Sequence, residues 1–325
     1  NIFGHNKFME QAGTIVAQGN IVAINANHDE RLLQKKIIEL TDENYDVLIF
    51  GSSRSMLLKE SLFSNESVHN YSVSGSGLQD DLALLTLYIE SRHQYPKKVV
   101  LGLDPWVLNE NSGDTRWQSL SDSYLKGMQQ LGLEPEKIGQ MKQDKYKQLI
   151  SFPYIKASLS ALKNHPGTVR QVASEDEMSD TEGGMNPDGS HIEQRCIANR
   201  TDVEVEKDAQ SYVSDSIVYQ MEKYNELSNK RILLLTKLVD NLKVNGVEVI
   251  FYLPPYHPYV YEQLFANPQY NTFLKAETYI RSMAKDNGIT VYGAYNPKEL
   301  GVDNSDFTDG MHLRYDRASK VFKVI

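Results

Sequence analysis

Asp46-Val-Leu-Ile-Phe50, followed by Gly51-Ser-Ser-Arg-Ser55, joins a short apolar run to a polar turn. The apolar run is β-branched and aromatic and stops at a glycine, which predicts a buried strand that ends in a turn. A hydroxyl between a strand and a helix faces a cleft, and the helix N-terminus behind it supplies N–H groups. Ser53 is therefore a candidate nucleophile. Glycine and serine also suit ordinary turns and helix caps, so this motif alone leaves a structural role open.

Four further apolar runs and a set of helical patterns extend this unit in both directions. The other expected strands lie at 68–73, 98–103, 246–253 and 288–292. The chain before Asp29 is expected to be extended, and Asp29 to cap a helix that ends near residue 41. Apolar residues at helical spacing predict further helices at 56–63, 78–89, 232–242, 260–284 and 314–322. Strands that alternate with helices predict a parallel sheet with right-handed crossovers.

From 111 to 229 the regular alternation stops, and this polar, charged segment is predicted to be a long, mostly helical insertion before the fourth strand. The expected fold class is α/β, a three-layer αβα arrangement around a five-stranded, doubly wound parallel sheet. The whole chain, 1–325, is expected to form a single domain that includes the insertion. Ligands of such sheets bind at the carboxyl ends of the strands, so the loops that follow the strands are where a site is expected.

Composition and charge exclude several classes of protein. The 325 residues carry a formal net charge of −9, and this acidic balance argues against binding nucleic acid, which needs a basic face. Cys196 is the only cysteine, so neither an internal disulfide nor a thiolate metal cluster can form. The histidines lack metal-ligand spacing and no P-loop ending is present, so we expect no metal and no cofactor. No uncharged apolar run approaches the roughly 18 residues of a membrane span.

The loop after the fifth strand reads Phe307-Thr-Asp-Gly-Met-His-Leu313. Asp309 stands three residues before His312, so both fit on one turn with the carboxylate next to the imidazole. Such a carboxylate fixes the tautomer of a histidine and favours the imidazolium that forms when the ring takes a proton. Asp-x-x-His alone is common and mostly structural. Together with Ser53 at the same sheet edge, it completes the residues of serine-based acyl transfer.

These motifs resemble the sequence blocks of the SGNH/GDSL hydrolase superfamily. Gly51-Ser-Ser53 is similar to its Gly-Asp-Ser block, Asn70-Tyr-Ser-Val-Ser-Gly75 to its second block, and Asp309-Gly-Met-His312 to its final Asp-x-x-His block. The likeness is closest to SGNH-like proteins of bacterial cell-surface polymer modification, which include the D-alanyl-lipoteichoic-acid biosynthesis protein and the alginate O-acetylation proteins. It implies an SGNH/flavodoxin-like fold. It covers the sheet-forming parts at both ends of the chain but not the insertion.

The resemblance implies a role for each matching residue. Ser53 would be the nucleophile, His312 the general base and Asp309 its orienting partner. The backbone N–H groups of Ser53 and Gly75 would be oxyanion donors. The implied activity is that of a serine esterase or O-acyltransferase, which forms an acyl-enzyme on Ser53 and acts on a cell-envelope or exported polysaccharide.

The third block departs from the family pattern. The family has Gly-x-Asn-Asp, whose asparagine donates to the oxyanion, whereas this chain has Gly102-Leu-Asp-Pro-Trp106. An ionised Asp104 beside a developing oxyanion would oppose the charge that has to be stabilised. Asp104 therefore either points away, or pairs with a cation such as Arg54, or leaves the donor role to Asn109 or Trp106.

Five residues near the strand ends are candidates for substrate contact: Arg54, Asp104, Trp106, Asn109 and His257. Arg54 follows the nucleophile and would meet an anion or the acyl carbonyl, or else form a salt bridge with Asp104. His257 lies in the Pro- and Tyr-rich segment 254–259, where it either contacts substrate or packs in a rigid loop.

The sequence bears differently on two alternatives to this enzyme. The departure at Asp104 keeps open a catalytically idle scaffold of the same fold that binds polysaccharide or a membrane-bound acyltransferase. An α/β-hydrolase is disfavoured, because Ser55 breaks the Gly-x-Ser-x-Gly pattern and that fold places its nucleophile later in the sheet. The chain begins with Asn1, and the resembling proteins carry an N-terminal anchor or signal, so we expect an extracytoplasmic protein, membrane-anchored or secreted through a removed segment.

Overall fold

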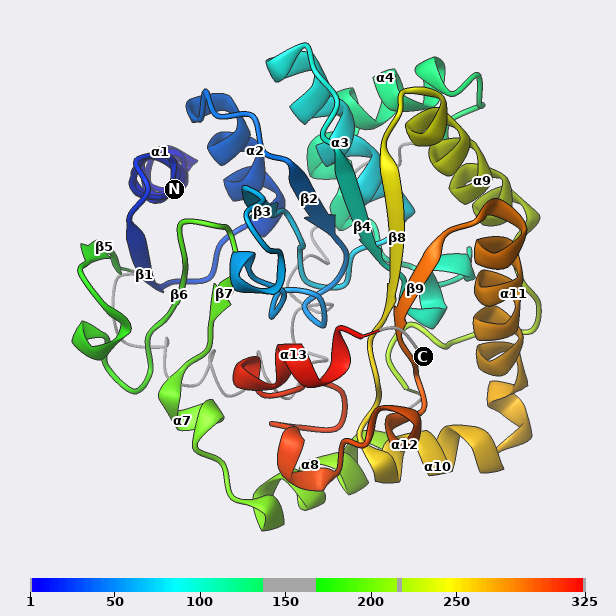
Figure 1. The fold of residues 1–325 in the computed structure, drawn as a ribbon. Coiled ribbons are helices and arrows are strands. Elements are labelled where there is room, and N and C mark those ends of the chain that lie inside the picture. Colours follow the sequence, from blue (N-terminus) through cyan, green and yellow to red (C-terminus); the bar gives the residue numbers. More distant parts are fainter. Residues whose placement is uncertain (1, 137–167, 215–217, 324–325) are drawn as a thin grey trace.

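A computed structural model of the chain describes residues 2–136, 168–214 and 218–323. At its centre is a five-stranded parallel sheet in which the strands lie in the order β3-β2-β4-β8-β9 (Figure 1). The bounds of these strands are Val47–Phe50 (β2), Val68–Asn70 (β3), Lys98–Gly102 (β4), Glu248–Leu253 (β8) and Thr290–Gly293 (β9). Each strand overlaps one of the five predicted runs, so the predicted α/β fold with a parallel sheet is confirmed.

The order of the strands gives this sheet a switch point. Numbered by their sequence within the sheet, the strands run 2-1-3-4-5, which is the flavodoxin-like, doubly wound order. The chain moves to one side from β2 to β3 and to the other side from β4 onward, so the switch lies between β2 and β4. Ligands of doubly wound sheets bind in the crevice at this point. Ser53 follows β2, and the topology therefore puts the candidate nucleophile there.

Helices flank both faces of the main sheet (Figure 1). The α-helices of the described residues are Ile2–Ala17 (α1), Glu30–Leu40 (α2), Leu78–Arg92 (α3), Ser121–Gln130 (α4), Arg195–Ala198 (α7), Asp202–Ser214 (α8), Asn229–Val244 (α9), Pro258–Ala266 (α10), Asn271–Asn287 (α11), Pro297–Leu300 (α12) and Ala318–Val321 (α13). As predicted, Asp29 caps α2, where its carboxylate accepts the N–H groups of Arg31 and Leu32.

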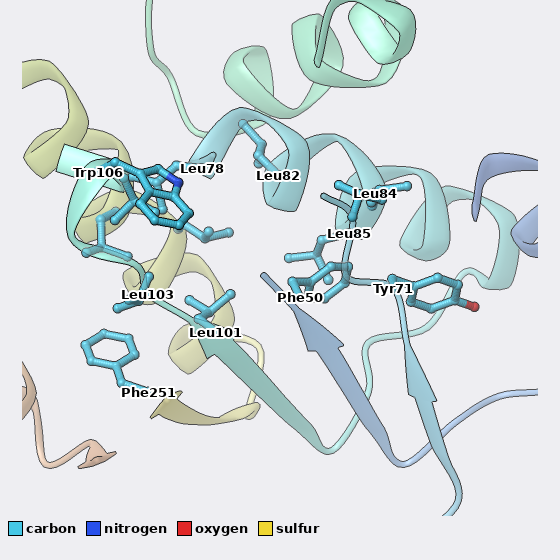
Figure 2. Packing of buried hydrophobic residues seen from close by; sticks show 14 of the residues in the cluster. Phe50, Tyr71, Leu78, Leu82, Leu84, Leu85, Leu101, Leu103, Trp106 and Phe251 are labelled. Carbon is cyan, nitrogen blue, oxygen red and sulfur yellow. The ribbon is translucent and has the colours of Figure 1, made fainter. Parts of the chain in front are cut away.

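The two faces of the sheet bury alternate residues of each strand, because successive side chains of a strand point in opposite directions. Phe50 and Leu101 belong to the larger core, which Figure 2 shows between the strands and α3. Their neighbours Ile49 and Val100 belong to a smaller core on the other face, to which α12 and α13 contribute. Burial on both faces is why the predicted runs are continuously apolar rather than alternating.

A second, antiparallel sheet joins the N-terminal region to the insertion, which was predicted to be mostly helical. Its strands lie in the order β5-β1-β6-β7. Their bounds are Ile21–Asn25 (β1), Thr168–Val172 (β5), Gly183–Met185 (β6) and His191–Ile192 (β7). β1 pairs with β5 on one side and with β6 on the other, and the sheet lies beside the β3 edge of the main sheet (Figure 1). The described part of the insertion thus packs on the rest of the chain.

Two predicted helices, at 56–63 and 260–284, differ from the structure. Residues 56–63 form turns and a short 3-10 helix at Glu60–Leu62 instead of an α-helix. The adjacent Leu57 and Leu58 are both buried in the smaller core, so the apolar pattern reflects burial and not a helical face. The predicted helix 260–284 is divided into α10 and α11, because a proline at position 268 has no N–H and disfavours a helical residue before it.

The two ends of the chain also differ from the prediction. The opening segment is not extended throughout, since α1 precedes β1. The final predicted helix, 314–322, is reduced to a 3-10 turn at Tyr315–Arg317 and the short α13.

Candidate active site

The turn after β2 brings Ser53 to the sheet edge at a point where two strands approach closely. Gly51 has a φ of 148°, and a Cβ on it would lie 3.0 Å from the Cα of Gly102 on β4. A Cβ on Gly102 would lie 1.9 Å from Ser55 Oγ. Both positions require glycine, because any side chain would collide. The Ser55 N–H donates to the Ser52 carbonyl at 2.9 Å and closes the turn that carries Ser53.

Three side chains from distant parts of the chain form a continuous hydrogen-bonded line at this edge. Ser53 Oγ lies 2.8 Å from His312 Nε2, and His312 Nδ1 lies 2.8 Å from Asp309 Oδ2. With its proton on Nδ1, the ring donates to the carboxylate and its Nε2 can accept the proton of the Ser53 hydroxyl. A histidine base so oriented is what activates a serine hydroxyl as a nucleophile. The structure therefore brings together the three residues predicted as a triad.

Asp309 is held by its own loop. Its Oδ1 accepts the N–H groups of Met311 and His312, each at 2.8 Å. Burial alone would raise the pKa of Asp309, but the charge of His312 and these donors lower it to about 2. The carboxylate is consequently ionised at neutral pH and able to stabilise an imidazolium.

The two backbone groups predicted to bind an oxyanion are open. Among the residues that the structure describes, neither the Ser53 N–H nor the Gly75 N–H has an acceptor. Gly75 adopts a φ of 61°, and a Cβ there would lie 2.1 Å from Arg116 Nη2 and 2.3 Å from the Tyr219 hydroxyl. Glycine is thus required for both conformation and space. Preorganised N–H groups without a partner are suited to receive a developing negative charge.

A buried ion pair occupies the place of the missing asparagine. Arg54 Nη1 donates to Asp104 Oδ1 at 2.6 Å, and each side chain is only 1% exposed. Arg54 also donates to the carbonyls of Met311 and Pro254, at 3.0 and 2.7 Å, and its guanidinium lies 3.9 Å from the centre of the Tyr256 ring. Of the alternatives for Asp104, pairing with Arg54 is the one observed. Both residues hold loops together, and their burial does not support the expected contact with substrate.

Neither alternative donor is available for an oxyanion. The Trp106 indole N–H donates to the Ser76 carbonyl at 3.1 Å. The Asn109 amide donates to the carbonyls of Gln220 and Glu222, at 2.8 and 3.1 Å. Since both side chains are buried and their donors are used, the suggestion that Trp106 or Asn109 replaces the missing asparagine is not supported.

His257 is fully buried, so the expected contact with substrate is not supported here either. Its Nδ1 accepts the Tyr259 N–H at 3.3 Å, and its ring packs edge-on against Phe307 with 5.3 Å between the centroids. Burial lowers the pKa of His257, which keeps the ring neutral. It packs in the rigid loop that the sequence also allowed.

The charged surroundings of Gly75 were not predicted. Glu30 and Arg31, in the first turn of α2, bind the Ser74 backbone, and Arg116 of the insertion lies against Gly75. Asp29 marks the start of α2 in the sequence, and charged residues after an N-cap are usually solvated. Nothing local in the sequence reveals partners more than 40 residues away.

Glu193 is a second residue that sequence reasoning missed. It follows β7, is only 9% exposed, and its Oε1 has no hydrogen-bond partner among the described residues. Burial, and then the charge of Asp309, raise its pKa to about 8. At neutral pH the side chain is therefore mostly an uncharged acid close to the triad carboxylate.

Neither a metal site nor a membrane-spanning helix occurs in the described residues. In the ranges 2–136, 168–214 and 218–323, no group of three or more His, Cys, Asp or Glu side chains is placed to hold a metal ion. Cys196 is exposed. None of the helices in these ranges combines the length and hydrophobicity needed to cross a lipid bilayer.

The geometry can support nucleophilic substitution at an acyl carbon. It offers a serine hydroxyl with a base at 2.8 Å, an ionised carboxylate behind that base, and two unpartnered N–H groups in the described structure. In comparisons with known proteins, no family model matches the chain and no curated protein matches it.

Proposed function

We propose that this protein is an SGNH-type serine esterase or O-acyltransferase that acts on acetyl or other small acyl esters of a cell-envelope or exported polysaccharide. The observation that carries the proposal is the hydrogen-bonded line from Ser53 through His312 to Asp309. Its placement at the switch point of a doubly wound sheet, where such folds bind ligands, adds support. The polysaccharide and the extracytoplasmic location rest on the sequence resemblance alone.

The proposed reaction has two steps. Ser53 Oγ attacks the acyl carbonyl while His312 Nε2 takes the hydroxyl proton, and the carbonyl oxygen becomes an oxyanion near the N–H groups of Ser53 and Gly75. The C–O bond to the leaving alcohol then breaks, and His312 returns the proton to that alcohol. In the second step, water or a sugar hydroxyl loses a proton to His312 and attacks the acyl-enzyme. The bond from the acyl carbon to Ser53 Oγ then breaks, and His312 returns the proton to Ser53 Oγ. Transfer also requires an acyl donor, for which a membrane-bound acyltransferase would be a suitable partner.

The absence of the asparagine donor favours a slow enzyme. Loss of one oxyanion donor typically lowers turnover by roughly 10²- to 10³-fold. Here Asp104 stands at that position and is engaged by Arg54. A transferase with a dedicated partner tolerates such a rate better than a general esterase does.

The test is covalent labelling combined with turnover. A fluorophosphonate is expected to add to Ser53, as read by mass spectrometry of peptides, and a chromogenic acetyl ester to be hydrolysed. Ser53→Ala should abolish both signals without loss of folding, because the one side-chain hydrogen bond of Ser53 among the described residues is to His312. Absence of the adduct on Ser53 in the wild type would falsify the proposal, as would equal turnover by Ser53→Ala.

The buried Arg54–Asp104 pair is the observation that favours a second candidate, a catalytically idle scaffold that binds polysaccharide or a membrane acyltransferase. Cellular complementation separates the two functions. A scaffold retains its role in cells as Ser53→Ala, whereas the enzyme loses it.

A further inference from the structure

Two charged residues of α2 hold the peptide group that carries one of the oxyanion donors. Arg31 Nη2 donates to the Ser74 carbonyl at 3.3 Å. The Glu30 carboxylate accepts both the Ser74 N–H and, at 2.8 Å, the Ser74 hydroxyl. Ser74 is thus bound at its N–H, its side chain and its carbonyl by consecutive residues of one helix. The next N–H in the chain is that of Gly75.

Arg31 is itself fixed in place. Its Nε and Nη2 donate to the two oxygens of Asp80, at 2.6 and 2.9 Å, and both residues are 2% exposed. Asp80 also accepts the Gly77 N–H at 3.1 Å. Glu30, Arg31 and Asp80 therefore bind the loop 74–77 at both of its ends, and a planar guanidinium fork gives the contact a defined direction.

Because the peptide group between Ser74 and Gly75 is rigid, fixing the Ser74 carbonyl also fixes the direction of the Gly75 N–H. No cis peptide occurs in the described residues, so the carbonyl of Ser74 and the N–H of Gly75 point in opposite directions from one rigid plane. With the carbonyl turned toward Arg31, the Gly75 N–H is turned away from α2 and has no acceptor in the described structure. A glycine peptide at a φ of 61° can otherwise rotate easily, because no side chain restricts it.

We propose that Glu30 and Arg31 are positioning residues that orient the Gly75 N–H as an oxyanion donor. This inference rests on the proposed function of Ser53. An oriented Gly75 N–H matters more here than in a site with a side-chain donor. Asp104 is paired with Arg54, and the described oxyanion donors are backbone groups. Donors that are fixed before the reaction stabilise the charge without a cost of reorganisation.

The test compares variants of the helix that carries both residues. Glu30→Ala removes both acceptors from Ser74 and should lower kcat for an acetyl ester, and the rate of fluorophosphonate addition to Ser53, by roughly 10- to 100-fold, less than outright loss of a donor. KM should change by less than about threefold, since the oxyanion forms only in the transition state. Glu30→Gln keeps an acceptor oxygen for the Ser74 N–H, and its NH2 group can donate to the Ser74 hydroxyl oxygen, so this variant should recover most of the loss. Arg31→Lys should resemble Glu30→Ala, because an ammonium cannot fork between Asp80 and Ser74.

Asp29→Ala is the matched control. Asp29 caps the same helix by accepting the Arg31 and Leu32 N–H groups but does not contact Ser74. It should lower the melting temperature by a similar amount to Glu30→Ala and leave kcat near the wild-type value. If the two variants lose kcat equally, or if Glu30→Ala raises KM without lowering kcat, the positioning role is wrong and Glu30 only stabilises α2.

Hydrogen exchange separates this inference from the proposed function. The Ser74 amide should exchange slowly in the wild type and at least tenfold faster in Glu30→Ala, whether or not the protein hydrolyses an ester. A wild type that labels Ser53 while Glu30→Ala labels at the same rate overturns the positioning role alone. A wild type that fails to label Ser53 overturns the proposed function, and unchanged Ser74 exchange then overturns the hold on the loop as well.

Discussion

The carboxylate of Asp309 accepts more hydrogen bonds than any other group of the triad. It accepts two backbone N–H groups and the His312 ring, and its pKa of about 2 keeps it ionised. Asp309→Asn should lower kcat by roughly 10³- to 10⁴-fold, because an amide no longer selects the ring tautomer in which Nε2 accepts a proton. The measurement is steady-state turnover of an acetyl ester between pH 6 and 9.

Asp303→Asn is the control for that variant. Asp303 belongs to the same loop and accepts the Ser305 N–H, but it does not contact His312. Its turnover should stay near wild type. Retention of more than about a tenth of kcat by Asp309→Asn would contradict a role for this carboxylate in the proposed reaction.

Glu193, close to Asp309, makes the free energy of unfolding depend on pH. Its folded pKa of about 8 lies above its ordinary value of 4.5, so its contribution is fully present below pH 4.5. Between these values the unfolded chain ionises Glu193 and the folded chain does not, and stability is lost as the pH rises. Glu193→Gln should therefore be more stable than wild type at pH 8, by on the order of 1–3 kcal/mol, with a smaller advantage at pH 4. Urea unfolding at both pH values measures this difference, and an offset that does not change with pH would contradict it.

At the scale of elements, Arg54 connects the ends of four strands. Its guanidinium reaches Asp104 after β4, Pro254 after β8 and Met311 in the loop after β9, while its own residue follows β2. Arg54→Met leaves Asp104 buried without its partner, which should cost about 3–5 kcal/mol of unfolding free energy. The double variant Arg54→Met/Asp104→Leu should recover part of this loss. Denaturant titrations of both single variants and the double variant close the thermodynamic cycle.

Lys298→Met supplies the comparison for an exposed ion pair. Lys298 and Glu262 lie 3.0 Å apart with side chains 71% and 56% exposed, and such pairs are worth at most about 1 kcal/mol. A loss in Arg54→Met no larger than that in Lys298→Met would show that the Arg54 links do not stabilise the loops.

Elements with a local physical signature could be predicted, and those with distant partners could not. The five strands of the main sheet are apolar because both faces are covered, and Ser53, Asp309 and His312 follow strands of that sheet. β1 is itself a short β-branched run in a segment expected to be extended, but the sequence does not reveal its antiparallel partners β5 and β6, which lie far along the chain. The hydrogen bonds that fix the Ser74–Gly75 peptide and the burial of His257 depend in the same way on residues far along the chain.

At the scale of the whole molecule, the second sheet supports the loop that carries the nucleophile. The turn between β6 and β7 docks on β3, where the Asn70 N–H donates to the Asp188 carbonyl at 2.8 Å. The Asp188 side chain accepts the Glu60 N–H at 2.8 Å, and the His191 N–H donates to the Met56 carbonyl at 3.1 Å. Residues 56–60 come shortly after Ser53, and no α-helix stiffens them. The insertion therefore takes over a role that a helix after β2 has in simpler sheets.

Gly189 is the position where this docking can be broken with a matched control. Gly189 and Gly246 both have a φ of 76°, but a Cβ on Gly189 would lie 2.4 Å from the Asn70 carbonyl oxygen, whereas a Cβ on Gly246 meets nothing within 4 Å. Alanine at either site carries a conformational strain of about 1 kcal/mol. Only Gly189→Ala must also move the turn away from β3.

Gly189→Ala should therefore lose about 1–3 kcal/mol more unfolding free energy than Gly246→Ala, as overpacked sites do. Hydrogen exchange should quicken at Asn70 and at 56–60 in Gly189→Ala alone, and ester turnover should fall with it. Equal stability losses and unchanged exchange in the two variants would mean that the second sheet is a passive appendage of the main sheet rather than a support for the loop of Ser53.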